Sequence, residues 1–176
     1  MANNCYYRMK AVADNEDALK RFVEIMKYND DEFFIYRCFN ADAEGEIQKE
    51  NELFSLIITG DVAWSCVKWF DGVEDFDCKA QNLDGTLRNN SHYITLDLLC
   101  NKLGIGLEVW SQESGCEFEE HYIVNRKGEI VINEEEVWSQ DWWDEENNCE
   151  REEPIEIGGF DDWGSFCLAN EIFYEN

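Results

Sequence analysis

The sequence predicts an α+β fold in which an antiparallel sheet carries two helices on one face. Two segments, 14–30 and 95–104, have apolar residues at helical spacing, and strand-like segments with alternating apolar and polar residues lie around them. Several such segments follow one another after the second helix, joined by short turns. The chain is 44% hydrophobic and 14% aromatic, which is enough for a packed core. Its 176 residues suit one domain, or one domain with an extension.

The first half of the chain predicts three strands and one amphipathic helix. A strand is expected at 5–13, and Asp14 can cap the helix that follows. Two further strands are expected at 33–39 and 52–60, and residues 61–70 could form a short helix or an irregular packed segment. The apolar stripe of the helix has i, i+3, i+4, i+7 spacing and consists of Leu19, Phe22, Val23 and Met26.

The second half predicts a shorter helix and then a meander of three strands. Thr95 can cap the helix, and Gly104 can adopt the left-handed conformation that ends it. Gly128 suits a positive φ in the turn before the last strand. The expected strands are 105–112, 116–125 and 129–133. In the middle one, Glu119 and His121 share a face opposite to Glu120 and Tyr122, so one side of this strand is expected to be largely solvated.

The order of elements and several residues resemble the YubB ferredoxin-like family of small phage and plasmid accessory proteins. The resemblance spans about residues 1–133. The matching segments are MANNCYYRMKAVA, FSLIITGDVAWSCVKWF and GLEVWSQESGCEFEEHYIVNRKGEI, in which Glu113, Gly115 and Gly128 match the family's closing hairpin. The family commonly has prolines near the tryptophan of the second segment, and this chain has none there. The resemblance implies a ferredoxin-like core at 1–133 and a mobile-element origin, without a settled activity.

Residues 134–176 are predicted to be an acidic, tryptophan-rich extension, packed on that core as extra strands or a short helix. The net charge of the chain is −26, and residues 129–176 hold 16 acidic residues and one basic residue, Arg151. Nucleic acids and anionic membranes are therefore excluded as direct partners, because binding them requires clustered Lys and Arg. A field of this sign attracts basic surfaces instead. No apolar run is long enough to span a membrane, and no signal segment opens the chain, so a cytoplasmic location in a host cell is expected.

No motif in the sequence predicts a reaction. The chain has no phosphate-binding loop, no nucleophile elbow and no HExxH. Its two histidines are His92 and His121, and Cys116 faces away from His121 if both lie on one strand. We therefore expect no enzyme activity, no catalytic residues, no cofactor and no designed metal site. One alternative stays open, a small metal-dependent hydrolase that uses the acidic loop Asp71–Asp77.

The eight cysteines form no CxxC pair. Without a secretory signal, reduced structural thiols are expected rather than disulfides or metal ligands. Four of them lie in apolar runs, where cysteine acts as a small hydrophobic residue: Cys38, Cys66, Cys100 and Cys167.

The acidic extension suggests a function by mimicry. Carboxylates held on a rigid surface can imitate phosphates, and the tryptophans could serve as buried supports or as interface anchors. The predicted function is a phage-type inhibitor that occupies the basic DNA- or RNA-binding surface of a host defence protein, of the anti-CRISPR or anti-restriction kind. A phage accessory module that binds its partner without mimicry is a further alternative. The expected contact residues are Glu134, Glu135, Glu136, Asp141, Trp142, Trp143, Asp144, Glu145, Glu146, Glu152, Glu153, Asp161 and Asp162.

Overall fold

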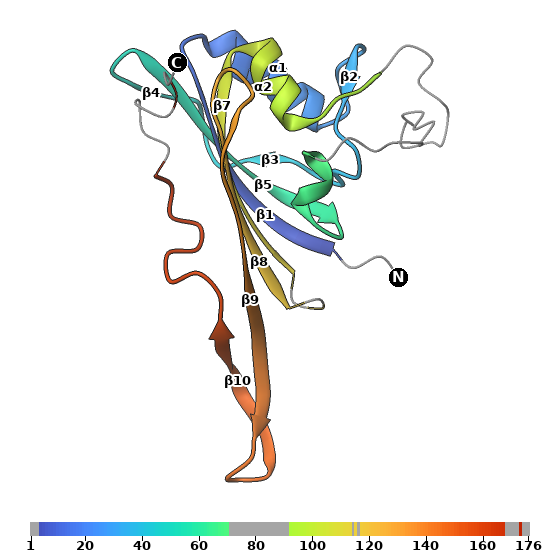
Figure 1. Ribbon diagram of the computed structural model, residues 1–176, viewed down its shortest axis with the longest axis vertical. Helices are drawn as coiled ribbons and strands as arrows, with labels where there is room; N and C mark the ends of the chain where they lie inside the picture. Colours follow the sequence, from blue (N-terminus) through green and yellow to red (C-terminus); the bar gives the residue numbers. More distant parts are fainter. Residues whose placement is uncertain (1–3, 71–91, 114, 116, 168–172, 174–176) are drawn as a thin grey trace.

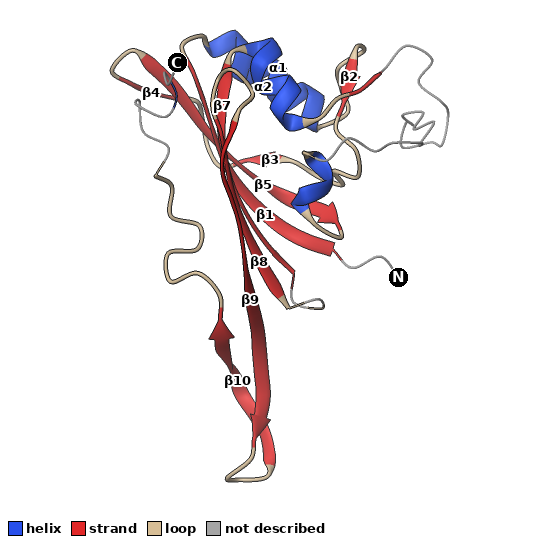
Figure 2. Ribbon diagram, in the orientation of Figure 1, coloured by secondary structure: helices blue, strands red, loops and turns tan. Residues whose placement is uncertain are grey.

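A large antiparallel sheet forms the body of the protein. The structure is a computed structural model that describes residues 4–70, 92–113, 115, 117–167 and 173. The sheet has eight strands in the order β10-β9-β8-β7-β1-β5-β3, and β4 also pairs with β5 (Figures 1 and 2). The strands are β1 Asn4–Ala13, β3 Asp42–Ala43, β4 Gln48–Glu50, β5 Leu53–Ala63, β7 Ile105–Glu113, β8 Phe118–Val124, β9 Ile130–Asp144 and β10 Cys149–Gly158. Two short strands, β2 Phe33–Phe34 and β6 His92–Tyr93, pair in parallel apart from this sheet.

The prediction of a ferredoxin-like fold is wrong. In the described residues the chain is mostly antiparallel sheet, with only two α-helices, α1 Glu16–Met26 and α2 Leu96–Leu103. These helices have 11 and eight residues. They lie near one end of the sheet, where α1 contacts β1 and β5 and α2 contacts β7 (Figure 1). The sheet is strongly twisted and curls, so two short helices cannot cover its face.

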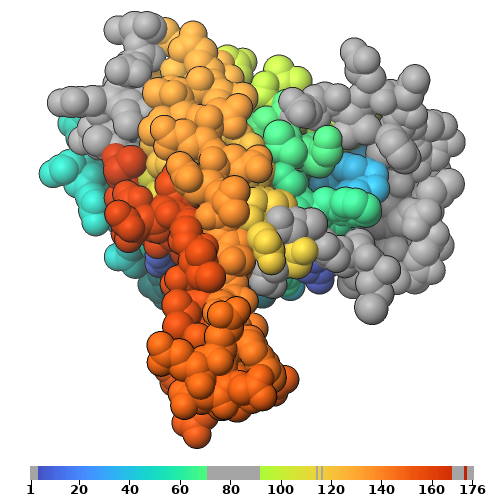
Figure 3. Space-filling view, turned by 60° about the horizontal axis from the view of Figure 1, so that its bottom comes forward, coloured from blue at the N-terminus to red at the C-terminus, as the bar shows by residue number. Residues whose placement is uncertain are grey.

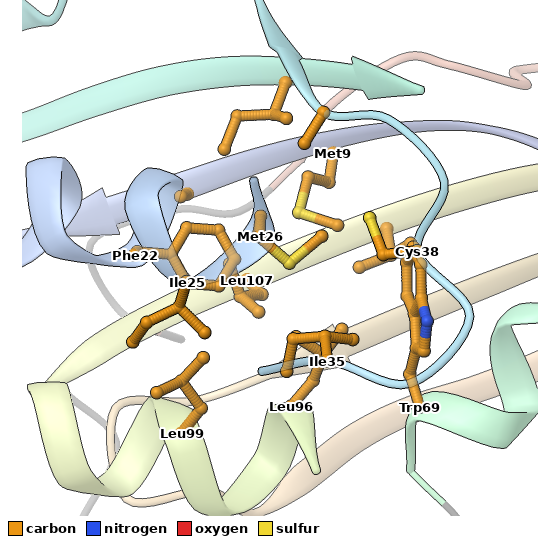
Figure 4. Close-up of a cluster of buried hydrophobic side chains, with 14 of the residues drawn as sticks. Met9, Phe22, Ile25, Met26, Ile35, Cys38, Trp69, Leu96, Leu99 and Leu107 are labelled. Carbon is orange, nitrogen blue, oxygen red and sulfur yellow. The ribbon is translucent and has the colours of Figure 1, made fainter. Parts of the chain in front are cut away.

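The main core lies between the helices and the sheet. Phe22 and Ile25 of α1 and Leu96 and Leu99 of α2 are fully buried against Leu107 of β7 (Figure 4). Of the predicted stripe on α1, Leu19, Phe22 and Met26 are fully buried, whereas Val23 is half-buried and Ile25 is buried in addition. Further buried members of the same cluster are Met9, Met26, Ile35, Cys38 and Trp69.

The helix ends follow local sequence closely. Asn15, one residue after the expected cap, begins α1, and its side chain accepts a hydrogen bond of 2.9 Å from the N–H of Asp17. Thr95 precedes α2, and Gly104 ends it with a φ of 68°. Gly128 has a φ of 81° in the turn before β9, as expected, and a Cβ there would meet the carbonyl of Asp97 at 2.4 Å.

A short 3₁₀ helix, η1 Cys66–Trp69, connects the end of β5 to the core. The buried indole of Trp69 packs edge-on against Tyr7, with ring centroids 4.9 Å apart. Its Nε1–H donates to the carbonyl of Tyr36 at 3.0 Å. Part of the 61–70 segment is therefore a short helix, as one of the two predicted options, while the rest of it continues β5 to Ala63.

The acidic segment after Asn133 continues the sheet. β9 runs from Ile130 to Asp144 without a break, so a single strand crosses the boundary that the sequence suggests at 133. Its first half pairs with β8, and its second half pairs with β10. The division into a core at 1–133 and an extension at 134–176 stays a prediction, while the strand that joins the two parts is a feature of the fold.

Candidate functional site

A hairpin made of β9 and β10 projects from the body of the molecule (Figures 1 and 3). Asp144 holds its turn, because one carboxylate oxygen accepts the N–H groups of Glu146 and Asn147 at 3.1 Å. The other oxygen accepts the side-chain amide of Asn147 at 2.8 Å. These hydrogen bonds, first of all the side-chain bond from Asn147, lower the pKa of Asp144. The tip of the hairpin is thus locally ordered and negatively charged.

Residues 130–158 contain 11 acidic residues and one basic residue, a formal charge of −10. Glu134, Glu135 and Glu136 lie on the part of β9 that pairs with β8, and most of the other predicted contact residues lie on the projecting hairpin 138–158. Asp141 and Asp144 are half-buried and lie 3.7 and 3.6 Å from the guanidinium of Arg151. Asp161 and Asp162 are exposed but lie beyond the hairpin, in the segment that follows it. The other predicted acids are all exposed: Glu134, Glu135, Glu136, Glu145, Glu146, Glu152 and Glu153.

The tryptophans of the hairpin fall into two groups. Trp138 is buried, with 4% of its surface exposed, and it serves as a support. Trp142 and Trp143 are 51% and 46% exposed, and they point to opposite faces because they are neighbours on one strand. The suggestion that indole rings hold the carboxylates in place therefore applies to Trp138, whereas Trp142 and Trp143 are available as interface anchors.

One face of the hairpin carries an exposed apolar strip. Ile157 is opposite Ser139 and Ile155 is opposite Asp141, and paired residues of an antiparallel ladder share a face. Val137 and Trp143 lie on the same face by the alternation of β9. The side chains of Val137, Ile155 and Ile157 are between 50% and 73% exposed. The hairpin thus offers apolar contact area as well as charge.

The outer face of β7 and β8, on the side away from the helices, is covered by residues 160–167. Phe160 packs edge-on against Trp110, with ring centroids 5.3 Å apart, and its N–H donates to Glu119 at 2.8 Å. The carbonyl of Gly164 accepts from Arg8 at 2.7 Å, and that of Ser165 accepts from Trp110 at 3.0 Å. The expectation that one side of the 116–125 strand is solvated is therefore wrong: every described side chain of β8 after Phe118 is buried.

A compact cluster of three chemically different side chains lies under this covering segment. Glu108 is fully buried. Its Oε1 atom accepts hydrogen bonds from Nε2 of His121, at 3.1 Å, and from the thiol of Cys167, at 3.3 Å. Its Oε2 atom accepts the N–H of Cys167 at 2.8 Å. The imidazole of His121 stacks on Trp110 with a centroid separation of 3.7 Å and an angle of 5°. Imidazole, thiol and carboxylate are all ligands that a transition metal ion accepts.

The arrangement does not favour a cysteine nucleophile. Partial burial raises the pKa of the Cys167 thiol to about 11, and the hydrogen bond and charge of Glu108 add to the shift. A thiol with a raised pKa is mostly protonated at neutral pH, and a nucleophile has to be a thiolate. His92, on β6, is exposed and distant in the fold from this cluster. Cys116 and the acidic loop Asp71–Asp77 lie outside the described residues. The hydrolase alternative therefore stays a prediction.

The cysteines in the described residues are free thiols. Cys38, Cys66 and Cys100 are buried in the core, as their apolar surroundings predict, and burial raises the pKa of each. Cys167 differs from the prediction because it is exposed and bonded to Glu108. Sequence analysis missed the cluster, since its members are far apart in the chain. The available signal was Glu108, a lone acid inside the apolar strand IGLEVW.

A second buried carboxylate joins η1 to the sheet. Glu120 accepts from the hydroxyls of Ser65 and Ser111, at 2.5 and 2.6 Å, and from the N–H of Cys66 at 2.9 Å. Only 1% of Glu120 is exposed. These bonds fix the start of the helix that carries Trp69, so we assign Glu120 a structural role.

Comparison of the chain with protein-family models, with curated proteins and with solved structures gives no significant match. The resemblance to the YubB family therefore stays a prediction. Within the part of the chain that the structure describes, no helix has both the length and the apolar character needed to cross a membrane.

Proposed function

We propose that the protein is a non-enzymatic inhibitor of phage or mobile-element type, in which the β9–β10 hairpin imitates a nucleic-acid strand. Its partner would be a host defence protein of the anti-CRISPR or anti-restriction target class, met in the cytoplasm of the host. The observation that supports this most directly is the formal charge of the projecting, hydrogen-bonded hairpin 138–158, which is −7 from eight acidic residues and Arg151, with Glu134, Glu135 and Glu136 on the adjoining part of β9. The hairpin would occupy the Lys- and Arg-lined surface that normally holds phosphates.

The spacing of the charges suits one nucleic-acid strand better than a duplex. A β-strand rises about 3.4 Å per residue, which equals the axial charge spacing of about 3.4 Å in one strand of DNA. Glu134, Glu135 and Glu136 are consecutive and exposed, and they match that axial density when both faces of the strand are counted, because each face alone carries one charge per about 6.8 Å. The 15 residues of β9 span about 50 Å at this rise. The 11 acidic residues of 130–158, spread over this length, give about one charge per 4–5 Å. This charge density is far below that of a duplex, which has one charge per about 1.7 Å.

The test is a matched pair of charge-reversal variants. In the first, Glu135, Glu136, Glu152 and Glu153 are changed to Lys. In the control, four exposed acids from other parts of the sheet and α1 are changed to Lys: Glu24, Glu46, Glu50 and Glu52. Both variants shift the net charge by the same amount, so a general charge effect would appear in both.

The assay measures transformation of an unprotected plasmid into cells that carry a restriction or CRISPR system, for a panel of such systems. We expect the wild type and the control to restore transformation, and the hairpin variant to lose at least about tenfold of that protection. Binding to the purified target should weaken as salt rises and should be displaced by single-stranded nucleic acid. Protection that survives reversal of the hairpin charges contradicts the mimicry proposal.

The apolar strip supports a second candidate, an accessory module that docks on its partner without mimicry. Val137, Ile155 and Ile157 would then provide most of the contact. Under this reading, changing Ile155 and Ile157 to Ser abolishes binding, whereas raised salt and added nucleic acid have little effect. Under mimicry, raised salt and added nucleic acid weaken binding strongly and the two Ile→Ser changes weaken it less. The same binding assay therefore separates the two candidates.

A further inference from the structure

The three ligand-type side chains on the outer face of β7 and β8 are placed as a metal site would need them. The Nε2 atom of His121 and the Sγ atom of Cys167 lie 3.1 and 3.3 Å from the same oxygen of Glu108. All three ligand atoms lie within 4.8 Å of one another. In a tetrahedral zinc site with bonds of about 2.0–2.3 Å, neighbouring ligand atoms are separated by about 3.3–3.8 Å. Small side-chain movements would therefore open room for an ion.

The environment of the cluster also suits a bound cation. Glu108 is fully buried and His121 is 5% exposed, which makes their orientations fixed by packing. His121 is held flat against Trp110, and its Nδ1 atom lies 3.9 Å from a carboxylate oxygen of Glu134. This distance is too long for a hydrogen bond, but it places a carboxylate on the side of the second ring nitrogen, where metal-binding histidines commonly have an acceptor. Cys167 is exposed, so an ion can enter from solvent on that side.

We propose that Glu108, His121 and Cys167 bind one zinc-class transition metal ion, which fastens the segment 160–167 to the sheet. The combination of thiolate, imidazole and carboxylate selects zinc or a similar ion over Mg²⁺ and Ca²⁺, which prefer oxygen ligands alone. On binding, the Cys167 thiol releases its proton to the buffer and its sulfur bonds the ion. Nε2 of His121 loses the proton that it donates to Glu108, and the neutral ring takes the tautomer with its proton on Nδ1, so that Nε2 bonds the ion. Oε1 of Glu108 turns from hydrogen-bond acceptor to ligand, and Oε2 keeps the N–H of Cys167. Water completes the coordination on the exposed side.

The test uses Co²⁺ as a spectroscopic substitute for zinc, on the purified full-length chain after chelator treatment. Excess Mg²⁺ is present throughout, so that it occupies the surface carboxylates of this acidic protein. A thiolate-to-cobalt charge-transfer band reports a Co–S bond, and carboxylates cannot produce it. We expect one Co²⁺ per chain and displacement of the band by an equal amount of Zn²⁺.

Three variants locate the site. Cys167→Ser should abolish the band, whereas Cys149→Ser, which removes an exposed thiol on β10, should leave it unchanged. His121→Gln can still bond Glu108, and it should weaken zinc binding by at least about tenfold. Zinc should also raise the melting temperature of the wild type and Cys149→Ser, and have a much smaller effect in His121→Gln.

Several outcomes would overturn the proposal. One is a wild type that shows no charge-transfer band. Others are a band that persists in Cys167→Ser or disappears in Cys149→Ser. A rise in melting temperature of the same size in wild type, Cys149→Ser and His121→Gln would show adventitious binding at surface carboxylates. The melting experiment remains decisive if Cys167→Ser fails to fold, because His121→Gln and Cys149→Ser do not depend on that variant.

Discussion

Replacing Glu120 by Ala should be strongly destabilising, because it removes the buried acceptor of four hydrogen bonds, the longest of which comes from the hydroxyl of Tyr122 at 3.4 Å. The N–H of Cys66 and the hydroxyl of Ser111 are both buried and would lose their partner. Each buried donor left without an acceptor costs about 1–3 kcal/mol, and the half-buried hydroxyl of Ser65 adds less. Removing a desolvated carboxylate offsets part of this cost. We expect the free energy of unfolding to fall by about 3–5 kcal/mol.

Urea denaturation followed by tryptophan fluorescence measures the change, provided that the slope m is the same in both proteins. The matched control is Glu135→Ala, since Glu135 is the exposed cross-strand neighbour of Glu120 on β9. That variant should lie within about 0.5 kcal/mol of the wild type. Glu120→Gln keeps one carbonyl acceptor and should fall between the two. A loss below about 1 kcal/mol in Glu120→Ala would refute the assignment of Glu120 as the anchor of η1.

Two further substitutions test the buried carboxylate Glu119 and the close backbone contact at Gly60. Burial raises the pKa of Glu119 in the folded state. The folded protein therefore loses stability as the pH rises through the range in which this carboxyl ionises, and at lower pH the protonated group has no such cost. Glu119→Gln can still accept from the N–H of Phe160, and its stability relative to the wild type should increase as the pH rises from acid to neutral. Chemical denaturation at several pH values measures this difference in the free energy of unfolding. A difference that stays constant over the range would contradict the prediction. At Gly60 an added Cβ would lie 2.1 Å from the carbonyl oxygen of Asn40 and 2.7 Å from the hydroxyl of Tyr7. Gly60→Ala should therefore lower the free energy of unfolding by about 1–3 kcal/mol or more. An unchanged melting temperature would show that β5 and the 40–41 segment can move apart without cost.

Local signals in the sequence predicted the parts of the fold that depend on local chemistry. The left-handed Gly104 and the turn at Gly128 are present, and so is the stripe on α1 apart from Val23, which is half-buried. Each depends on residues within a few positions of one another, because helical periodicity and positive φ are properties of short segments. The strands 5–13 and 105–112 also match β1 and β7 closely.

The features that sequence analysis missed depend on contacts between distant segments. The polar side of β8 is buried because residues 160–167 cross over it, and no pattern within FEEHYIV indicates such a cover. The same cover buries Glu119 and His121 on this side of β8. The acidic segment after Asn133 was ambiguous between helix and strand, and pairing with β8 decides it in favour of a strand. Pairing of this kind is a tertiary effect that overrides local propensity.

The positions of the proposed contact residues were predictable in part. An excess of acids among tryptophans identified the segment, while the faces on which they lie required the register of β9 and β10. Trp138 and Trp142 are four residues apart and look equivalent in the sequence, yet one is buried and the other is exposed. The difference arises because Trp138 still lies beside the body, opposite Gly158, whereas Trp142 has passed beyond it.

The unbroken run of β9 from the body into the hairpin has a practical consequence for protein engineering. Two residues removed from each strand, taken as facing pairs between Trp138 and Asp144, shorten the projection by one pleat and leave every remaining side chain on its original side. If the hairpin enters a basic channel as proposed, the shortest version in a graded set of such deletions that still inhibits would give the depth of that channel.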